Sequence, residues 1–325
     1  MKILVTGGAG YIGSHVVNEL NKHDHEVTVV DDLTNGSRQN LFAKNRFIQG
    51  KIQDEKILDQ IAQDAPEAIF HFSAWKAAGE SMTNPEKYML NNINGTLPLL
   101  ARMHDFGCRY FIFSSSAAVY GEPDYLPIDE NHKLSPQNYY GYTKLCIEEN
   151  LAWLEKLRGI KYAALRYFNA AGYDPEGKIT GIEKSTANLL PVIMEVAAGL
   201  RDKYYIFGDD YDTPDGSCIR DYIHVTDLAR AHVLALDYII QQQQSLVVNL
   251  GSETGHSVLE ISDMAEKIVG KKIPHQLMGK RDGDTSTLYA TAAKARQLLG
   301  WEPQWSDPHT IIKTMWDVYK NYKQD

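Results

Sequence analysis

Close to its N-terminus the chain reads Ile3-Leu4-Val5-Thr6-Gly7-Gly8-Ala9-Gly10-Tyr11-Ile12-Gly13. An apolar run typical of a buried strand leads into glycines spaced as Gly8-x-Gly10-x-x-Gly13, and a helical pattern over 12–22 follows. In this context the first glycine permits a tight turn, the second lets a pyrophosphate approach the backbone, and the third lets the helix pack on the strand. The first amide groups of such a helix face the phosphates. The stretch therefore predicts a dinucleotide-binding site.

Short apolar runs alternate with helical patterns through the first half of the chain. We expect buried strands at 26–30, 68–72, 110–113 and 163–167 and helices such as 12–22 and 142–157. Alternation at this spacing requires right-handed crossovers, which place helices on both faces of a parallel sheet. The predicted fold class is α/β, a Rossmann-type doubly wound parallel sheet.

The pattern loosens after Gly172, where 173–184 is rich in glycine, proline and charge. We predict a dinucleotide-binding Rossmann domain over 1–172 and, over 173–325, mainly a smaller C-terminal α/β domain for the substrate. Helices are expected near 186–199 and 225–240, with an irregular stretch up to Gly216 between them. A strand at 247–250 is expected to rejoin the main sheet, so segments near 220–250 return to the first domain.

Composition limits the partners and the compartment. The chain has 325 residues and a net charge of −9, which disfavours nucleic acid and anionic membranes as partners. Its three cysteines, Cys108, Cys146 and Cys218, have no metal-ligand spacing and form no disulfide framework, so we predict no metal site. A strand begins at once and no apolar run reaches membrane-spanning length, so a cytoplasmic location is expected.

Asp31 ends the second predicted strand, 18 residues beyond Gly13. A carboxylate at this place accepts hydrogen bonds from the adenosine ribose hydroxyls and disfavours a 2′-phosphate. The predicted cofactor is therefore NAD rather than NADP. Asp32 either shares this role or caps a turn, and Asp31 is the first candidate.

A second motif, Tyr140-Gly141-Tyr142-Thr143-Lys144, carries acid–base chemistry. A Tyr and a Lys four residues apart share one helical face, where the ammonium favours the phenolate and lowers the Tyr pKa. A tyrosinate beside a nicotinamide can take a proton from a sugar or steroid hydroxyl while hydride leaves the same carbon. Ser116 ends a serine run after the strand at 110–113, where ligands bind in open α/β sheets, and is expected to hydrogen-bond the reacting hydroxyl.

Seven motifs stand in order along the chain. They are 7–15, 71–76, 91–96, 114–121, Tyr140-x-x-x-Lys144, 166–169 and 220–225. Together they resemble the UDP-glucose 4-epimerases of the extended short-chain dehydrogenase/reductase superfamily, over residues 3 to about 300. The glycine and Tyr/Lys motifs mark the superfamily, while Phe72–Lys76, Tyr167–Asn169 and Arg220–Val225 narrow the resemblance to the epimerases.

The resemblance implies reversible C4 epimerisation of UDP-galactose and UDP-glucose with tightly bound NAD, in a homodimer. It implies that Tyr140 is the base, that Lys144 binds the nicotinamide ribose and that Ser116 contacts the sugar. The implied cofactor-binding residues are Gly7, Gly10, Tyr11, Ile12, Gly13, Asp31, Asp32, Leu33, Asn35, Gly36, Ile52, Phe72, Ser73, Ala74, Lys76, Asn91, Ser114, Tyr140, Lys144 and Tyr167. The implied substrate-binding residues are Lys76, Ser116, Tyr140, Phe168, Asn169, Asn188, Leu189, Phe207, Arg220, Arg281, Asp284 and Leu288. Arg suits the UDP diphosphate because its fork matches phosphate geometry.

Three positions depart from the family pattern. Lys51 stands where relatives usually carry an Asp beside the adenine, and Ala118 where many carry Ser or Thr. Leu288 falls at a position that gates the sugar pocket, where bulky residues exclude an N-acetyl group and small ones admit it. Leu is intermediate, so we expect UDP-galactose to be preferred over UDP-GalNAc.

Other reactions on this fold remain to be separated. A 4,6-dehydratase or a decarboxylase carries a carboxyl group at the serine strand, whereas this chain has alanines at 117 and 118. A methyl group cannot move a proton, so elimination is disfavoured. A plain NAD-dependent dehydrogenase would release its cofactor at every turnover. A non-catalytic nucleotide sensor would be expected to lose Tyr140 or Lys144. An epimerase acting on both UDP-glucose and UDP-N-acetylglucosamine is the alternative within the family.

Overall fold

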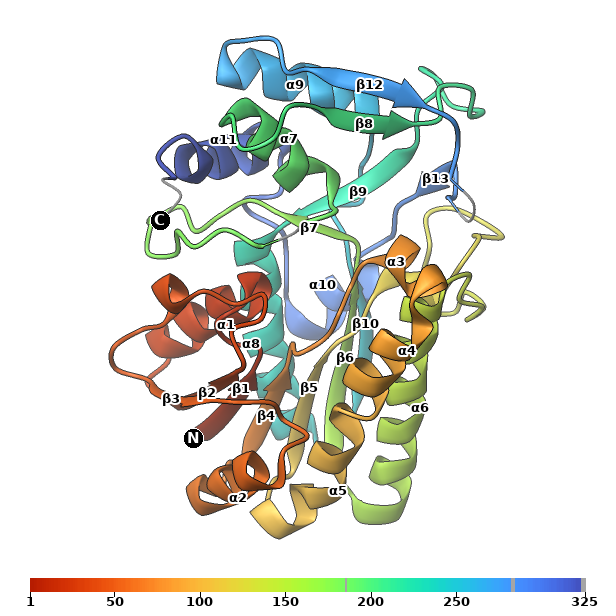
Figure 1. The fold of residues 1–325 in the computed structure, drawn as a ribbon. Coiled ribbons are helices and arrows are strands. Elements are labelled where there is room, and N and C mark those ends of the chain that lie inside the picture. The colour runs from red at the N-terminus through yellow and green to blue at the C-terminus, as the bar shows by residue number, and fades with distance from the viewer. Residues whose placement is uncertain (185, 282–283, 323–325) are drawn as a thin grey trace.

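The computed structural model describes residues 1–184, 186–281 and 284–322, and a sheet of seven parallel strands forms its larger part (Figure 1). The strand order is β10-β6-β5-β4-β1-β2-β3. The strands are β1 (Lys2–Thr6), β2 (Glu26–Asp31), β3 (Arg46–Gln49), β4 (Ala68–His71), β5 (Tyr110–Ser114), β6 (Lys161–Tyr167) and β10 (Leu246–Leu250). The predicted doubly wound parallel sheet is confirmed.

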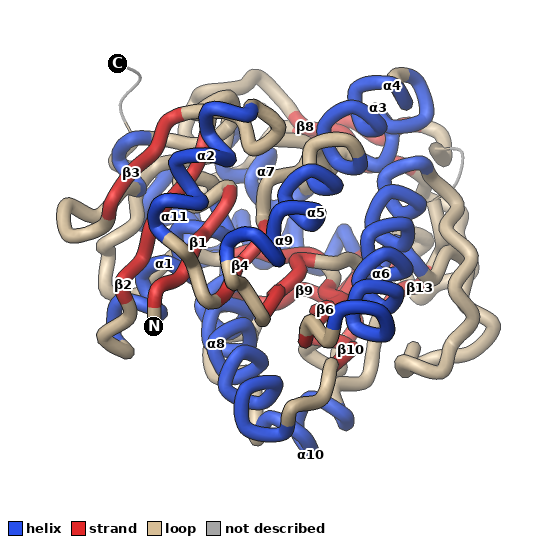
Figure 2. The backbone as a smooth tube through the Cα atoms, turned by 90° about the horizontal axis from the view of Figure 1, so that it is seen from below, coloured by secondary structure: helices blue, strands red, loops and turns tan. Residues whose placement is uncertain are grey.

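Helices cover both faces of this sheet, as the view along the strands shows (Figure 2). One face carries α1 (Tyr11–Lys22) and α8 (Val225–Gln242), and the other carries α2 (Glu55–Asp64), α5 (Thr96–Phe106) and α6 (Tyr139–Arg158). Successive strand residues point to opposite faces, so Ile3 and Val5 pack into the core under α1 and α8, while Leu4 packs into the core under α2, α5 and α6. Each face therefore has its own apolar core.

The chain leaves the large sheet after β6 and builds two smaller sheets above its carboxyl edge (Figure 1). The first contains β7 (Asn169–Ala171), β9 (Ile219–His224), β11 (Gly255–Ser257) and β13 (Thr287–Leu288). The second pairs β8 (Tyr204–Phe207) with β12 (His275–Met278). The helices of this part are α7 (Leu189–Ala197), α9 (Val258–Val269) and α11 (Pro308–Tyr319), while α10 (Ala293–Leu299) contacts α8 and β10. With α8 and β10 the chain returns to the large sheet.

Seven strands, β3, β7, β8, β9, β11, β12 and β13, were not predicted from the sequence, and β3 and β8 show why. β3 was not predicted, because Arg46 and Gln49 at its ends are polar and exposed on the sheet edge. β8 lies in a stretch expected to be irregular, and it forms because His275–Met278 supplies a parallel partner. In the described part of the chain, no helix is long and apolar enough to cross a membrane.

Candidate active site

The turn between β1 and α1 has room only for glycine at two positions. Gly7 has a φ of +72°, and a Cβ there would lie 2.8 Å from the backbone nitrogen of Ser73. A Cβ on Gly13 would lie 2.2 Å from the carbonyl oxygen of Gly7. Gly10 is the N-cap of α1 and no side chain caps that end, so its first amide groups can meet an anion. This cradle fits the pyrophosphate of a dinucleotide.

Asp31 is buried at the end of β2, directly beside this turn. Its carboxylate accepts hydrogen bonds from the backbone nitrogens of Ala9 at 3.0 Å and Leu33 at 2.8 Å. Burial raises the pKa of the Asp31 carboxyl, and these backbone hydrogen bonds oppose the increase. Asp32 instead accepts from the Thr34 nitrogen at 2.9 Å, which closes a turn. The two aspartates thus have different environments, and Asp31 faces the phosphate turn.

The other predicted cofactor-binding residues near this turn and at the sheet edge differ in how deeply they are buried. Gly36 is buried, and a Cβ there would lie 2.7 Å from Asp31 Oδ1, whereas Asn35 is exposed. Ile52 is buried just beyond β3, and the neighbouring Lys51 is exposed. Lys51, one of the three expected departures from the family pattern, is therefore exposed to solvent.

The segment after β4 forms a second wall. Phe72 lies between the phosphate turn and α8, with its ring centroid 5.0 Å from that of His232. Lys76 forms an ion pair with Glu183, with 2.6 Å between Nζ and Oε1, and its ammonium lies 5.8 Å from the centre of the Tyr11 ring. Ser73 and Ala74, which lie between Phe72 and Lys76, are half-buried. This wall continues the edge formed by the glycine turn.

Ser114, Lys144 and Tyr167 meet at the carboxyl end of β5. Lys144 Nζ donates a hydrogen bond to the carbonyl oxygen of Ser114 at 2.7 Å, and the Ser114 hydroxyl is hydrogen-bonded to the Tyr167 hydroxyl. Tyr140 lies on the same helix, with its ring centre 5.8 Å from Lys144 Nζ. Burial lowers the pKa of Lys144 to about 7, and Glu148 partly opposes this decrease.

The electrostatic expectation for Tyr140 is corrected by the structure. The Tyr/Lys spacing predicted a lowered phenol pKa, but burial raises the pKa of Tyr140, and only a hydrogen bond with Ser116 acts in the opposite direction. The Lys144 ammonium donates to Ser114 and lies 5.8 Å from the centre of the Tyr140 ring, so in the protein alone burial outweighs the stabilisation of the phenolate by this charge. The positive charge of an oxidised nicotinamide ring, bound next to the phenol, would favour the phenolate.

A buried polar network that the sequence did not reveal holds the backbone of Tyr140. Its nitrogen donates to Ser81 Oγ at 3.0 Å, and its carbonyl oxygen accepts from Thr143 Oγ1 at 2.7 Å. Asn92 Nδ2 donates to Thr143 Oγ1 at 3.1 Å and to the Trp75 carbonyl oxygen at 2.9 Å. Asn92 therefore connects the wall after β4 to α6.

Asn92 belongs to a π-helical turn, Met89–Ile93. Such turns occur frequently at functional sites. Only Asn91 was predicted from this stretch, and its amide donates to Asn92 Oδ1 at 3.1 Å. A second Asn inside a helical segment was the available signal, because Asn is an unfavourable residue in a helix interior.

A buried ion pair joins α6 to β6. Arg166 donates to Glu148 from Nε at 3.0 Å and from a terminal nitrogen at 2.5 Å. Ser115 also donates to Glu148, and Tyr120 accepts from Arg166 at 3.1 Å. Glu148 stands four residues after Lys144, a spacing that the sequence analysis did not use. This network fixes α6 to β6 and sets a negative charge near Lys144.

The predicted diphosphate-binding residues converge between β8, β9 and the segment before β13. Asp284 Oδ2 accepts from Arg281 Nε at 2.7 Å, and Asp284 Oδ1 lies 3.8 Å from a terminal nitrogen of Arg220. The guanidinium of Arg281 lies 4.4 Å from the centre of the Phe207 ring. Two guanidinium groups thus share one carboxylate beside an aromatic ring. The guanidinium groups suit a phosphate, and the ring suits a nucleotide base.

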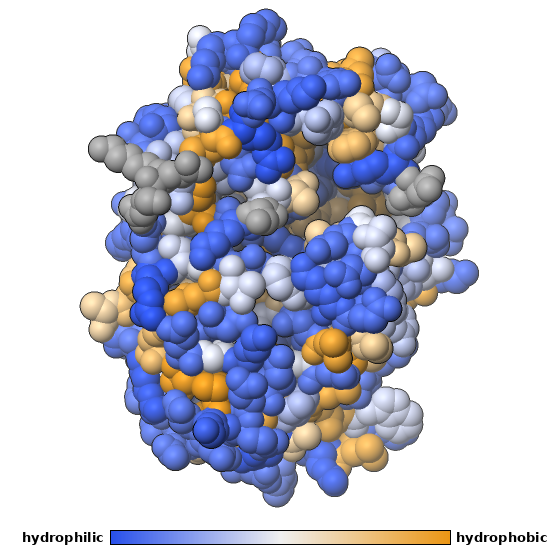
Figure 3. Space-filling model, in the orientation of Figure 1, coloured by the Kyte–Doolittle hydropathy of each residue, from blue (hydrophilic) through white to orange (hydrophobic). Residues whose placement is uncertain are grey.

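The predicted sugar-side residues lie on β7, β13, the start of α7 and the residue between β6 and β7. Leu288 on β13 lies beside Arg220 on β9 in the sheet. Together with Phe168, it packs against a small apolar cluster that contains Ala117. Asn169 Nδ2 donates to the carbonyl oxygen of Asp221 at 3.0 Å. Asn188 and Leu189 begin α7 and are half-buried. Figure 3 shows this face of the molecule hollowed between its upper and lower parts, with an apolar floor.

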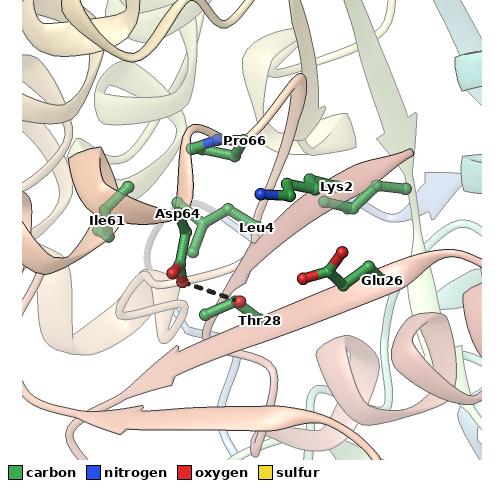
Figure 4. A pocket seen from close by; sticks show the side chains of 8 residues that line it. Lys2, Leu4, Glu26, Thr28, Ile61, Asp64 and Pro66 are labelled. Carbon is green, nitrogen blue, oxygen red and sulfur yellow. Dashed lines mark hydrogen bonds between the residues drawn. The ribbon is translucent and has the colours of Figure 1, made fainter.

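A small pocket lies away from these residues, at the amino ends of β1 and β2 (Figure 4). It has a volume of about 10 Å³, which is room for about one water molecule. Thr28 donates to Asp64 at 3.1 Å inside it. In the described ranges, no group of three or more His, Cys, Asp or Glu side chains is arranged to hold a metal ion. The candidate site is therefore the carboxyl edge of the large sheet.

Comparison with known proteins agrees with this site. A family model described as "NAD dependent epimerase/dehydratase family" matches residues 3–251. A UDP-glucose 4-epimerase of Streptococcus mutans is 46% identical over 325 residues, which cover 99% of this chain and 98% of that enzyme. The chain belongs to the UDP-glucose 4-epimerase family. The family resemblance inferred from the motifs is thereby confirmed.

Solved structures of this epimerase family share the whole fold. UDP-glucose 4-epimerase from Brucella ovis in complex with NAD has a TM-score of 0.94 and 41% identity, and 98% of each chain is covered. The UDP-Glc/GlcNAc 4-epimerase of Campylobacter jejuni has a TM-score of 0.85 and 40% identity, with 99% of each chain covered. The predicted epimerase fold therefore extends over both parts of this chain.

Proposed function

We propose that the protein is an NAD-dependent isomerase that interconverts UDP-galactose and UDP-glucose at C4 of the sugar. The observation that carries the proposal is the meeting of Tyr140, Lys144 and Ser116 at the end of β5, beside a phosphate turn that fits a dinucleotide. Membership of the epimerase family supports the substrate. Ala118 supplies no acid for elimination, which favours epimerisation over a dehydratase reaction.

Each part of the site has a distinct task in this reaction. The glycine turn and Asp31 would hold the pyrophosphate and adenosine ribose of NAD, and Ser73, Lys76 and Asn91 would bind other parts of the cofactor. When bound, NAD would supply the hydride acceptor and donor for C4. Tyr140 takes the proton of the sugar O4 hydroxyl and returns it after the sugar has presented its other face. Ser116 holds that oxygen, and Lys144 stabilises the phenolate.

Purified protein without added cofactor should convert UDP-galactose to UDP-glucose. The NAD retained from expression suffices because the hydride taken from C4 returns to C4. Chromatographic separation of the two UDP-sugars measures the conversion directly. A protein that converts no UDP-galactose, even with NAD added, would contradict the proposal. Stoichiometric accumulation of an oxidised or dehydrated sugar would instead indicate one of the other reactions.

Arg220→Ala and Arg281→Ala should weaken UDP binding. Each guanidinium would hold a phosphate that does not react, and charge-assisted hydrogen bonds contribute about 1.5–3 kcal/mol, so UDP affinity should fall roughly ten- to a hundredfold. Arg281 should lie at the lower end, since 55% of its side chain is exposed against 16% for Arg220. Calorimetric titration with UDP measures this, with Arg296→Ala, whose guanidinium pairs with Glu253, as control. Equal affinities in all variants would remove both arginines from the substrate site.

Leu288 should limit the sugars that are accepted. A hydrophobic pocket discriminates by about 1–3 kcal/mol per methylene-sized difference, so UDP-galactose should be preferred with some residual activity on UDP-GalNAc. Leu288→Ser and Leu288→Cys should raise kcat/KM for UDP-GalNAc roughly tenfold and spare UDP-galactose. Assays of both sugars test this, with Leu277→Ser on β12 as control. Similar kcat/KM for both sugars in the unmodified enzyme would mean that the gate is open and the enzyme has dual specificity.

We also propose a homodimer formed through α6. Tyr142, Trp153 and Leu157 are 49%, 58% and 62% exposed and, with Cys146, follow one face of this helix. Leu90, 58% exposed, lies on the adjoining π-helical turn, which contacts α6, and apolar patches colour this side of the molecule (Figure 3). Exposed apolar patches of this kind mark interaction surfaces, and one patch shared by two copies gives a two-fold dimer.

Trp153→Asp should convert such a dimer to monomers, because the charge would have to be buried against the partner. Light scattering coupled to size-exclusion chromatography measures the mass of both forms. Leu277→Asp, at an exposed position on β12, is the matched control and should stay dimeric. A monomeric unmodified protein, or an unchanged mass for Trp153→Asp, would contradict this interface.

The domain division and the location remain parts of this proposal. We assign the NAD-binding domain to residues 1–172 together with α8 and β10, and the nucleotide-sugar domain mainly to the rest of 173–325. The position of β10 beside β6 supports this division. Cys108, Cys146 and Cys218 carry free thiols, which suits a reducing compartment such as the cytoplasm.

A further inference from the structure

The loop between β7 and α7 is fastened to the helix that begins the dinucleotide site. Tyr11 donates its phenol hydrogen to the carbonyl oxygen of Gly172 at 2.5 Å, and the Asp174 nitrogen donates to His15 Nε2 at 3.0 Å. Both side chains belong to α1, and the loop runs above that helix (Figure 1). The first half of the loop is therefore held against the cofactor-binding part.

Gly181 joins the same loop to the phosphate turn itself. Its nitrogen donates to Asn40 Oδ1 at 2.9 Å and its carbonyl oxygen accepts from Asn40 Nδ2 at 3.3 Å. The same amide of Asn40 also donates to the carbonyl oxygen of Ala9 at 3.2 Å. A Cβ on Gly181 would lie 2.6 Å from Asn40 Oδ1 and 2.9 Å from Ser37 Oγ. This close approach requires glycine.

Two later residues of the loop, Glu183 and Lys184, reach two other walls of the site. Glu183 forms its 2.6 Å ion pair with Lys76, and 15% of the Glu183 side chain is exposed. Lys184 Nζ lies 3.5 Å from the carbonyl oxygen of Leu33, at the turn that follows Asp31. Gly181, Glu183 and Lys184 thus contact the glycine turn through Asn40, the wall after β4, and the adenosine-side turn.

We propose that residues 181–184 form a strap across the cofactor site, which slows the release of NAD between turnovers. The proposal rests on the proposed function, because these three walls are the ones assigned to NAD. An epimerase returns to the sugar the hydride that it took, so its cofactor need not leave. A strap fastened at three points must detach before NAD can dissociate, and each fastening raises that barrier.

The rate of NAD release from the purified holoenzyme tests the strap. Alcohol dehydrogenase with excess ethanol converts released NAD to NADH, whose fluorescence reports dissociation. Glu183→Gln removes the charge that pairs with Lys76 while keeping the side-chain shape, and release should become about three- to fivefold faster, as for a partly exposed ion pair. Gly181→Ala should accelerate release about tenfold or more, because the added Cβ pushes the loop from Asn40.

Glu176→Gln is the matched control in the same loop, since Glu176 pairs with Lys178 on the exposed surface. It should release NAD at the rate of the unmodified protein. Unchanged release from Glu183→Gln and Gly181→Ala, in a protein that still turns over UDP-galactose, would overturn the strap alone. An unmodified protein that neither binds NAD nor turns over would overturn both the strap and the proposed function.

Discussion

Tyr140→Phe is expected to lower kcat for UDP-galactose by roughly 10²–10⁴-fold, the usual contribution of a positioned general acid–base. The variant loses only the phenol oxygen. Ser81 and Thr143 hold the backbone at this position, because their hydrogen bonds go to the Tyr140 nitrogen and carbonyl oxygen rather than to the phenol. Helix α6 and the wall after β4 should therefore stay in place, and the loss should be in the chemical step rather than in folding.

Steady-state kinetics with UDP-galactose, UDP titration and the NAD content of the purified variant separate these effects. UDP affinity and NAD content should remain within about twofold of the unmodified protein, because the phenol contributes to proton transfer more than to ground-state binding. Tyr142→Phe, a half-exposed tyrosine on the same helix, is the matched control and should keep its kcat. A Tyr140→Phe enzyme with near-normal turnover would refute the assignment of the base.

Much of the fold follows from patterns that are local in the chain. The run Ile3–Val5, its glycines and the helix that follows are contiguous, so their periodicity indicates the βαβ unit directly. β3 and β8 escaped prediction because pairing partners stabilise them: Arg46–Gln49 lies against β2, and Tyr204–Phe207 pairs with β12 far along the chain. Such pairing is set by tertiary contacts rather than by propensity.

The site residues likewise divide into those that a local sequence pattern predicts and those that depend on distant contacts. Asp31, Tyr140 and Lys144 could be predicted because their chemistry is tied to a spacing within one segment. Asn92 and Ser81 act through hydrogen bonds to residues that are distant in sequence, and neither residue type signals this role. The sign of the Tyr140 pKa shift was also out of reach, because it depends on burial, which a Tyr/Lys spacing does not report.

Replacing Lys144 with methionine should be at least as damaging as Tyr140→Phe, again roughly 10²–10⁴-fold in kcat/KM near neutral pH. Methionine keeps the length of the side chain but removes the ammonium that stabilises the phenolate. In the unmodified protein burial lowers the pKa of Lys144 to about 7 and raises that of Tyr140. Phenol with amine and phenolate with ammonium carry the same net charge and differ only in which residue holds the proton.

Removing the Lys144 amine should therefore change the pH profile as well as the rate. As the pH rises through about 7 the unmodified pair loses one proton. The product of that loss includes the active phenolate form, so kcat/KM should rise through this region. In Lys144→Met only the Tyr140 proton remains, and burial holds its pKa above the ordinary value of about 10, so the rise should move to much higher pH. Assays of kcat/KM from about pH 6 to 10 test this, with the NAD content of each variant measured alongside. Lys156→Met, at an exposed lysine on the same helix, is the control. A Lys144→Met profile that still rises near pH 7 would show that Lys144 does not set the protonation state of the base.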